Sequence, residues 1–150
     1  MGCAGSTTML SREQLSVTDE LTARLERGRA SYGRQFGVAP DDAEARLGEL
    51  VGSRMAHEAV LAAGGVWGRG PLSTRDRSVA VVAALVAVGG AQARLRAHLG
   101  LALDNGVTRN ELEELVTLLA VYVGYPRASV AMESLRALLA ERPPAQTPTA

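Results

Sequence analysis

The sequence contains no lysine, a single cysteine and few aromatic residues. All sixteen basic residues are arginine, which excludes Schiff-base chemistry. An anionic substrate would therefore be held by guanidinium groups, whose planar fork suits carboxylates. The arginine-only, alanine-rich composition is typical of a bacterial chain with G- and C-rich codons. Because Cys3 stands alone, an internal disulfide, a CxxC redox pair and a thiolate metal cluster are all excluded.

The chain also lacks a net charge and a long apolar run. Its sixteen acidic and sixteen basic residues cancel, so no broad field attracts nucleic acid or an anionic membrane. The apolar run from Val79 to Ala93 is shorter than the roughly 18 residues that span a bilayer. No basic segment leads into an apolar stretch near the start. We expect a cytoplasmic protein with a small-molecule substrate and neither a nucleic-acid nor a membrane partner.

The pattern of apolar residues predicts an all-α fold, a compact bundle of about six helices without strands. With one Trp, one Phe and three Tyr in 150 residues, packing depends on Ala, Val and Leu. We expect one domain over residues 1–150, with loose ends at about 1–12 and 143–150. The helices are expected at about 18–35, 40–64, 75–88, 91–103, 108–122 and from the turn at 124–126 to 141.

Several helix ends have recognisable signals. Thr18 is the expected N-cap of the first helix and Gly37 its end, and Ser73 or Thr74 is expected to cap the third. Thr108 and Glu111 have the spacing of a capping box. The acidic residues that start this helix, Glu111, Glu113 and Glu114, are better explained by the helix dipole than by catalysis.

The third helix is apolar all round from Val79 onward, which predicts that it forms the buried centre of the fold. Together with the apolar segment 112–123, it offers more apolar surface than six short helices cover alone. We therefore expect a homo-oligomer.

Two histidines are the main candidates for chemistry. A three-histidine metal site is impossible within one chain, and neither Glu-x-x-His nor His-x-x-x-His occurs, so no metal site is expected. His98 is predicted on a half-apolar helix face, where a near-neutral pKa suits general acid/base catalysis. The alternative is a structural histidine. His57, between Arg54 and Glu58 on its helix, is expected at the surface.

Arg75 and Arg77 stand at the start of the third helix, where the helix dipole also favours anions. Two guanidiniums there could clamp a substrate carboxylate. The alternative is that they pair with Asp76 or other surface acids. The glycine-rich stretch 65–70 follows no strand and lacks Gly-Lys-Ser/Thr, so it is no phosphate loop.

The order of these segments resembles the carboxymuconolactone decarboxylase family over roughly Trp67 to Leu139. The matching segments are Leu72-Ser73-Thr74-Arg75-Asp76-Arg77-Ser78, Leu95-Arg96-Ala97-His98, Ala102-x-x-Asn105-Gly106-Val107-Thr108-x-x-Glu111-Leu112 and Tyr122-x-Gly124-x-Pro126-x-Ala128.

The resemblance implies a small all-helical protein that assembles as a trimer or hexamer without a cofactor. It also implies that His98 carries a proton in the active site, and that Arg75 or Arg77, Trp67 and Tyr122 contact the substrate. The family reaction removes CO2 from a γ-carboxy unsaturated lactone. A second, alkylhydroperoxidase D-like branch uses a CxxC pair just before the histidine. Residues 90–94 here contain no cysteine, so peroxidase chemistry by that route is excluded.

The sequence departs from the decarboxylase pattern at two polar positions. Gly65 stands where the family has a Glu, and Ser129 where it has an Asn; the first Trp of the family's Trp-Gly-Glu-Val-Trp segment is also missing. These losses indicate a changed substrate. We therefore expect a cofactor-free acid/base enzyme that decarboxylates or rearranges a small carboxylated lactone or enone. The alternatives are a tailoring isomerase, dehydratase or cyclase of secondary metabolism, and a catalytically silent oligomeric binding protein.

Overall fold

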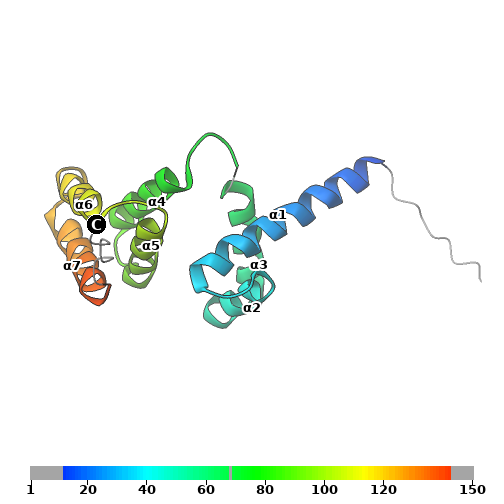
Figure 1. Ribbon diagram of the computed structural model, residues 1–150, viewed down its shortest axis with the longest axis horizontal. Coiled ribbons are helices and arrows are strands. Elements are labelled where there is room, and N and C mark those ends of the chain that lie inside the picture. Colours follow the sequence, from blue (N-terminus) through cyan, green and yellow to red (C-terminus); the bar gives the residue numbers. More distant parts are fainter. Residues whose placement is uncertain (1–11, 68, 143–150) are drawn as a thin grey trace, which may run out of the picture. The chain divides into compact units, whose positions relative to one another are not determined.

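The computed structural model describes residues 12–67 and 69–142, and within these ranges it contains seven α-helices and no strand (Figure 1). The predicted all-α class is confirmed. No helix of the described ranges is long and apolar enough to cross a membrane. Cys3 and most of the ends expected to be loose, residues 1–11 and 143–150, lie outside the described residues.

The helices form two units, residues 1–70 and 71–150, and each is described by itself. The first unit contains α1 (Arg12–Phe36), α2 (Pro40–Val51) and α3 (Ser53–Val66). The second contains α4 (Thr74–Val88), α5 (Gln92–Asp104), α6 (Arg109–Val123) and α7 (Tyr125–Glu141).

In the first unit, α1 packs against both α2 and α3 around a small core that includes Leu47 and Val60. Two buried glycines set the distance between α1 and α3. A Cβ atom added at Gly64 would overlap the backbone carbonyl of Arg24, and one at Gly28 would overlap that of Val60. The two helix backbones therefore touch, which a larger residue at either position would prevent.

Two predictions for this region were wrong. The first helix begins at Arg12, and Thr18 lies inside it, where its carbonyl accepts a hydrogen bond from the Thr22 hydroxyl at 2.9 Å. The segment 40–64 is two helices, because Gly52 adopts a φ of 84° and ends α2. The apolar spacing continues across this break, so periodicity alone does not reveal it.

In the second unit, the four helices surround one apolar core to which all of them contribute. The fully buried members with the largest side chains are Leu99, Leu112, Leu135, Val82, Val86 and Val116. Ser73 caps α4 by accepting a hydrogen bond from the Asp76 amide, and Thr108 and Glu111 form the capping box of α6. Both caps confirm the prediction.

The prediction that the third helix is buried on all sides was also wrong. On α4 the buried residues are Ser78, Val82 and Val86, which repeat every four positions, whereas Val88 is 72% exposed. The partners of α4 within the second unit, α5, α6 and α7, pack on this buried side. The other helices of the unit therefore leave part of the apolar surface of α4 exposed.

Candidate functional site

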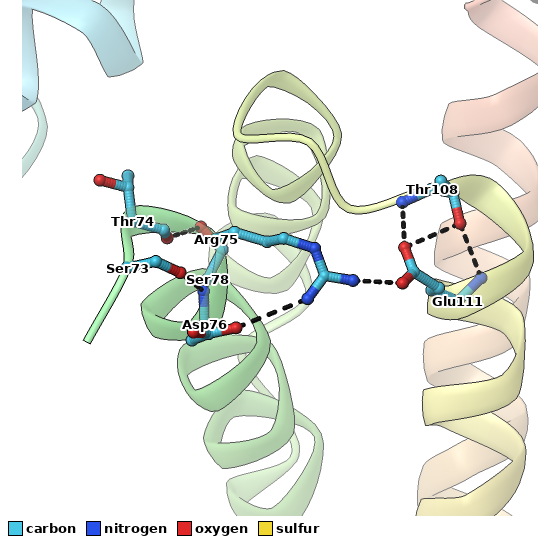
Figure 2. Close-up of polar contacts among 7 residues, drawn as sticks. All are labelled: Ser73, Thr74, Arg75, Asp76, Ser78, Thr108 and Glu111. Carbon is cyan, nitrogen blue, oxygen red and sulfur yellow. Dashed lines mark hydrogen bonds and ion pairs between the residues drawn. The ribbon is translucent and has the colours of Figure 1, made fainter. Parts of the chain in front are cut away.

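Arg75, in the first turn of α4, reaches across to the start of α6 (Figure 2). Its guanidinium donates to Glu111 Oε1 and lies 3.5 Å from Asp76 Oδ1. Both carboxylates belong to the second unit, and their hydrogen bonds with Arg75 are drawn in Figure 2. Of the two interpretations of Arg75, the structure shows the ion pairs with neighbouring acids.

Glu111 is itself fixed by the capping box. Its Oε2 atom accepts from the Thr108 amide and from Thr108 Oγ1, each at 2.8 Å, and its own amide donates to Thr108 Oγ1 at 3.2 Å. The bond from the Thr108 amide is the main cause that lowers the pKa of Glu111, and Arg75 lowers it further. Glu111 is therefore an anion at neutral pH, and a substrate carboxylate at Arg75 would compete with it.

A buried hydrogen bond joins the start of α4 to the end of α5. Ser78, 1% exposed, donates to the Thr74 carbonyl at 3.0 Å and accepts from Asn105 Nδ2 at 2.9 Å. This bond sets the alignment of the two helices. The first turn of α4, with Arg75 and Arg77, thus lies level with Asn105.

His98 lies partly buried on α5, on the helical stripe that runs from Arg94 through Leu101 to Asn105. Burial lowers the pKa of its imidazole below the ordinary 6.5, and the charge of Arg94 lowers it further. In the described part of the chain the ring has no hydrogen-bond or ion-pair partner. The result is a neutral imidazole with both nitrogens available for a small molecule.

His98 and the Arg75–Glu111 pair occupy different levels of the second unit. Asn105 follows His98 by seven positions (105 − 98), which is about 10 Å along a helix axis. Because Ser78 contacts Asn105 and α4 runs opposite to α5, Arg77 and Arg75 lie beyond Ser78 and more than about 10 Å from His98 along the helices. The structure therefore brings Arg75 together with Glu111 rather than with His98.

The two aromatic candidates lie in different units. Tyr122, near the end of α6, is 75% exposed. Trp67 belongs to the first unit, where it ends α3 and its amide donates to the Ala63 carbonyl at 2.7 Å. The substrate-binding roles of Trp67 and Tyr122 stay predictions.

Gly65 stands where the family pattern has a Glu, and the side chain of Arg24 packs against this glycine. The guanidinium of Arg24 occupies the position that a Cβ atom of residue 65 would take, and its Nε donates to the Leu61 carbonyl at 2.9 Å. Arg27 Nε donates to the Gly64 carbonyl at 3.0 Å. Arg27 thus satisfies a free carbonyl in the last turn of α3, and Arg24 binds a carbonyl one turn earlier. The only signals of this contact in the sequence were two arginines one helical turn apart in α1 and the Gly-Gly pair near the end of α3.

His57 lies at the surface, as expected, and joins three helices. Its Nδ1 is 2.9 Å from Oε1 of Glu44 on α2, and Arg29 of α1 binds the same carboxylate through Oε2, also at 2.9 Å. The hydrogen bond with His57 is the main cause that lowers the pKa of Glu44, followed by the bond with Arg29. Among residues 12–67 and 69–142, no three His, Cys, Asp or Glu side chains gather as a metal site would require.

Comparison with known proteins shows which family the chain is similar to. The model of the carboxymuconolactone decarboxylase family matches residues 55–137, more than half of the chain. A curated relative, 4-carboxymuconolactone decarboxylase of Acinetobacter baylyi, is 41% identical over 69 residues, which are 46% of this chain and 51% of the relative. The chain thus spans about half the length of that relative. The family match begins in α3, ends in α7 and includes every candidate residue from Trp67 to Tyr122.

Proposed function

Since the chain belongs to the carboxymuconolactone decarboxylase family, we propose that it is a cofactor-independent acid/base enzyme that decarboxylates or rearranges a small carboxylated lactone or enone. The observation that carries this proposal is the state of His98. The imidazole is partly buried, its pKa is lowered, and its ring is unbonded in the described part of the chain. The ring nitrogens are not fully buried, so a small molecule can reach them.

The chemistry requires one proton transfer. Loss of CO2 from a γ-carboxy lactone pushes an electron pair into the conjugated carbonyl, and the resulting dienolate must then be protonated on carbon. His98 supplies that proton once it is charged. An anionic substrate favours the charged imidazole and opposes the effects of burial and Arg94 on its pKa. In a rearrangement, neutral His98 instead removes a proton and returns it to another carbon.

The substrate carboxylate would be held by Arg75 or Arg77. Arg75 must exchange Glu111 for the substrate, which costs affinity but restricts binding to a ligand with its own carboxylate. Since these arginines and His98 are more than about 10 Å apart along the helices, the substrate must extend between them, or a second copy of the chain must complete the site.

We also propose a homo-oligomer, a trimer or hexamer as the family resemblance implies. The exposed apolar side chains at the end of α6 and the start of α7 support it. Leu118, Val121 and Tyr122 have helical spacing on α6, and Tyr125 begins α7. Their exposed fractions range from 54% for Leu118 to 77% for Val121, with Tyr122 and Tyr125 both at 75%. An apolar patch of this kind is typical of a protein interface, and Tyr is enriched in interfaces.

A catalytically silent binding protein is the second candidate. Two observations favour it. The side chain of Arg24 lies against Gly65, where the family pattern has a Glu, and Glu111 neutralises the charge of Arg75. The discriminating experiment incubates the protein with 4-carboxymuconolactone and follows the products by NMR and mass spectrometry. Loss of CO2 supports a decarboxylase, and an isomer of unchanged mass supports a rearranging enzyme. Binding without conversion would contradict both.

A further inference from the structure

The second unit contains a small cavity where α4 ends and where α5 and α7 begin. Its volume is about 180 Å³, and the side chains of Leu85, Leu95 and Ala131 give it an apolar lining. This is room for a small organic molecule. His98, Arg75 and Arg77 do not line it.

One charged side chain borders this cavity. The Nη1 atom of Arg127 donates to the Ala87 carbonyl at 2.6 Å, in the last turn of α4. Its aliphatic stem and Nε pass over Gly89, where an added Cβ atom would be 3.5 Å from Nε. Gly89, at a φ of 71°, turns the chain beneath the arginine. The side chain of Arg127 is exposed, but its guanidinium is tethered by a carbonyl and its stem lies over Gly89, with donors left for a ligand.

The charge of Arg127 has no carboxylate partner among residues 12–67 and 69–142. The other polar side chain that lines the cavity, Gln92, is neutral. Arg75, Arg96 and Arg142 of the same unit each pair with a carboxylate, whereas Arg127, like Arg94 and Arg136, has none among the described residues. A fixed positive charge therefore stands at the edge of an apolar cavity without an internal anion.

Backbone amides at two helix starts add to the positive charge beside the cavity. Both α5 and α7 begin at the cavity, and their N-cap residues, Ala91 and Gly124, provide no side-chain hydrogen bond. The amides of Gln92 and Arg127 lie in the first turns, where no helical carbonyl is available to them. They add partial positive charge beside the guanidinium.

We propose that this cavity binds a short branched aliphatic carboxylate, with the carboxylate at Arg127 and the hydrocarbon against Leu85 and Leu95. The apolar lining excludes a phosphate group, because its additional charged oxygens would lose water without gaining partners. The site does not depend on the chemistry proposed for His98, and binding to it is measured without turnover.

The test is titration of the full chain with sodium 2-methylpropanoate, followed by NMR amide shifts and calorimetry at constant ionic strength. The amide 2-methylpropanamide, which has the same shape without the charge, is the control ligand. We expect saturable binding of the carboxylate, with the largest shifts at Gln92 and Arg127, and affinity for the amide at least about tenfold lower. Equal affinity for the two ligands, or no binding of the carboxylate, would overturn the proposal.

Three variants locate the site. Arg127→Gln should weaken carboxylate binding about tenfold or more. Arg136→Gln removes the same charge from an exposed position on the same helix and should leave binding unchanged. Gln92→Glu places a carboxylate in the first turn of α5, which the helix dipole tolerates, and should also abolish binding without loss of the fold. Equal losses in Arg127→Gln and Arg136→Gln would show a nonspecific charge effect and would contradict the site, whereas His98→Gln should bind normally.

Discussion

Arg75 of α4 donates a hydrogen bond to Glu111 of α6, and the other carboxylate oxygen of Glu111 closes the capping box with Thr108. One carboxylate thus caps the start of α6 and neutralises the arginine at the start of α4. Residues 36 positions apart in the chain are joined in this way. Any anion that binds Arg75 must displace this bond.

The substitution Glu111→Gln tests that competition. Glutamine retains the capping-box geometry but has no charge, so the helix should remain and Arg75 should become available. If Arg75 binds the substrate, we expect KM to fall several-fold with little change in kcat, measured by steady-state kinetics.

Glu113→Gln, which removes a charge from the exposed face of the same helix, is the control and should leave KM unchanged. A rise in KM in Glu111→Gln would mean that Glu111 orients Arg75 rather than competing for it.

Replacement of glycine by alanine should have opposite effects on the free energy of unfolding at two positions of the first unit. Gly64→Ala should lower the free energy of unfolding by about 1–3 kcal/mol or more, because its Cβ would overlap the carbonyl of Arg24. Gly48→Ala should raise it by about 0.5–1 kcal/mol, because its Cβ would meet Ser53 only at 3.7 Å and Ala favours the helix. Urea denaturation measures both, and equal signs would contradict the close contact of α1 and α3.

Local signals made the helix ends of the second unit predictable. Ser73, and Thr108 with Glu111, lie within four residues of the amides that they cap, so the sequence contains both partners of each bond. The break at Gly52 was missed because glycine is compatible with both a helix and a turn, and the apolar spacing does not change there.

The site was less predictable, because its contacts join distant residues. His98 was identified from its family pattern and the apolar neighbours on its helix. The bond from Arg24 to Leu61, 37 positions apart, and the Ser78–Asn105 bond depend on how helices pack, which one sequence does not specify. The cavity at Arg127 likewise depends on where three helix ends meet.

Stability should decrease as the pH falls through the titration of His98. Because burial and Arg94 lower its pKa in the folded state, the unfolded chain takes up the proton first, at about 6.5. The free energy of unfolding should therefore be highest above this pH and should fall as the pH decreases from about 6.5 to the lowered pKa. Denaturation at several pH values measures this slope, and His98→Gln should reduce it. An unchanged slope in the variant would contradict the buried, uncharged state of His98.

If the protein is an oligomer, a charge introduced at Tyr122 should weaken its assembly. If the exposed face of α6 contacts a second copy, Tyr122→Glu places a charge in the interface and should shift the mass toward that of the monomer. Analytical ultracentrifugation at micromolar concentration measures it. Glu114→Gln, on the same helix, should leave the mass unchanged. A wild-type chain that is already monomeric at that concentration would refute the oligomer.

The most direct test of the account is turnover of 4-carboxymuconolactone, or of any substrate found by the product assay, in the variant His98→Gln. The chain has two histidines, so His57→Gln is the matched control. The account predicts that kcat falls about 100-fold or more in His98→Gln, in keeping with the loss of a general acid or base, and is unchanged in His57→Gln. An unchanged kcat in His98→Gln would contradict the role assigned to His98 and leave it as a structural residue of α5.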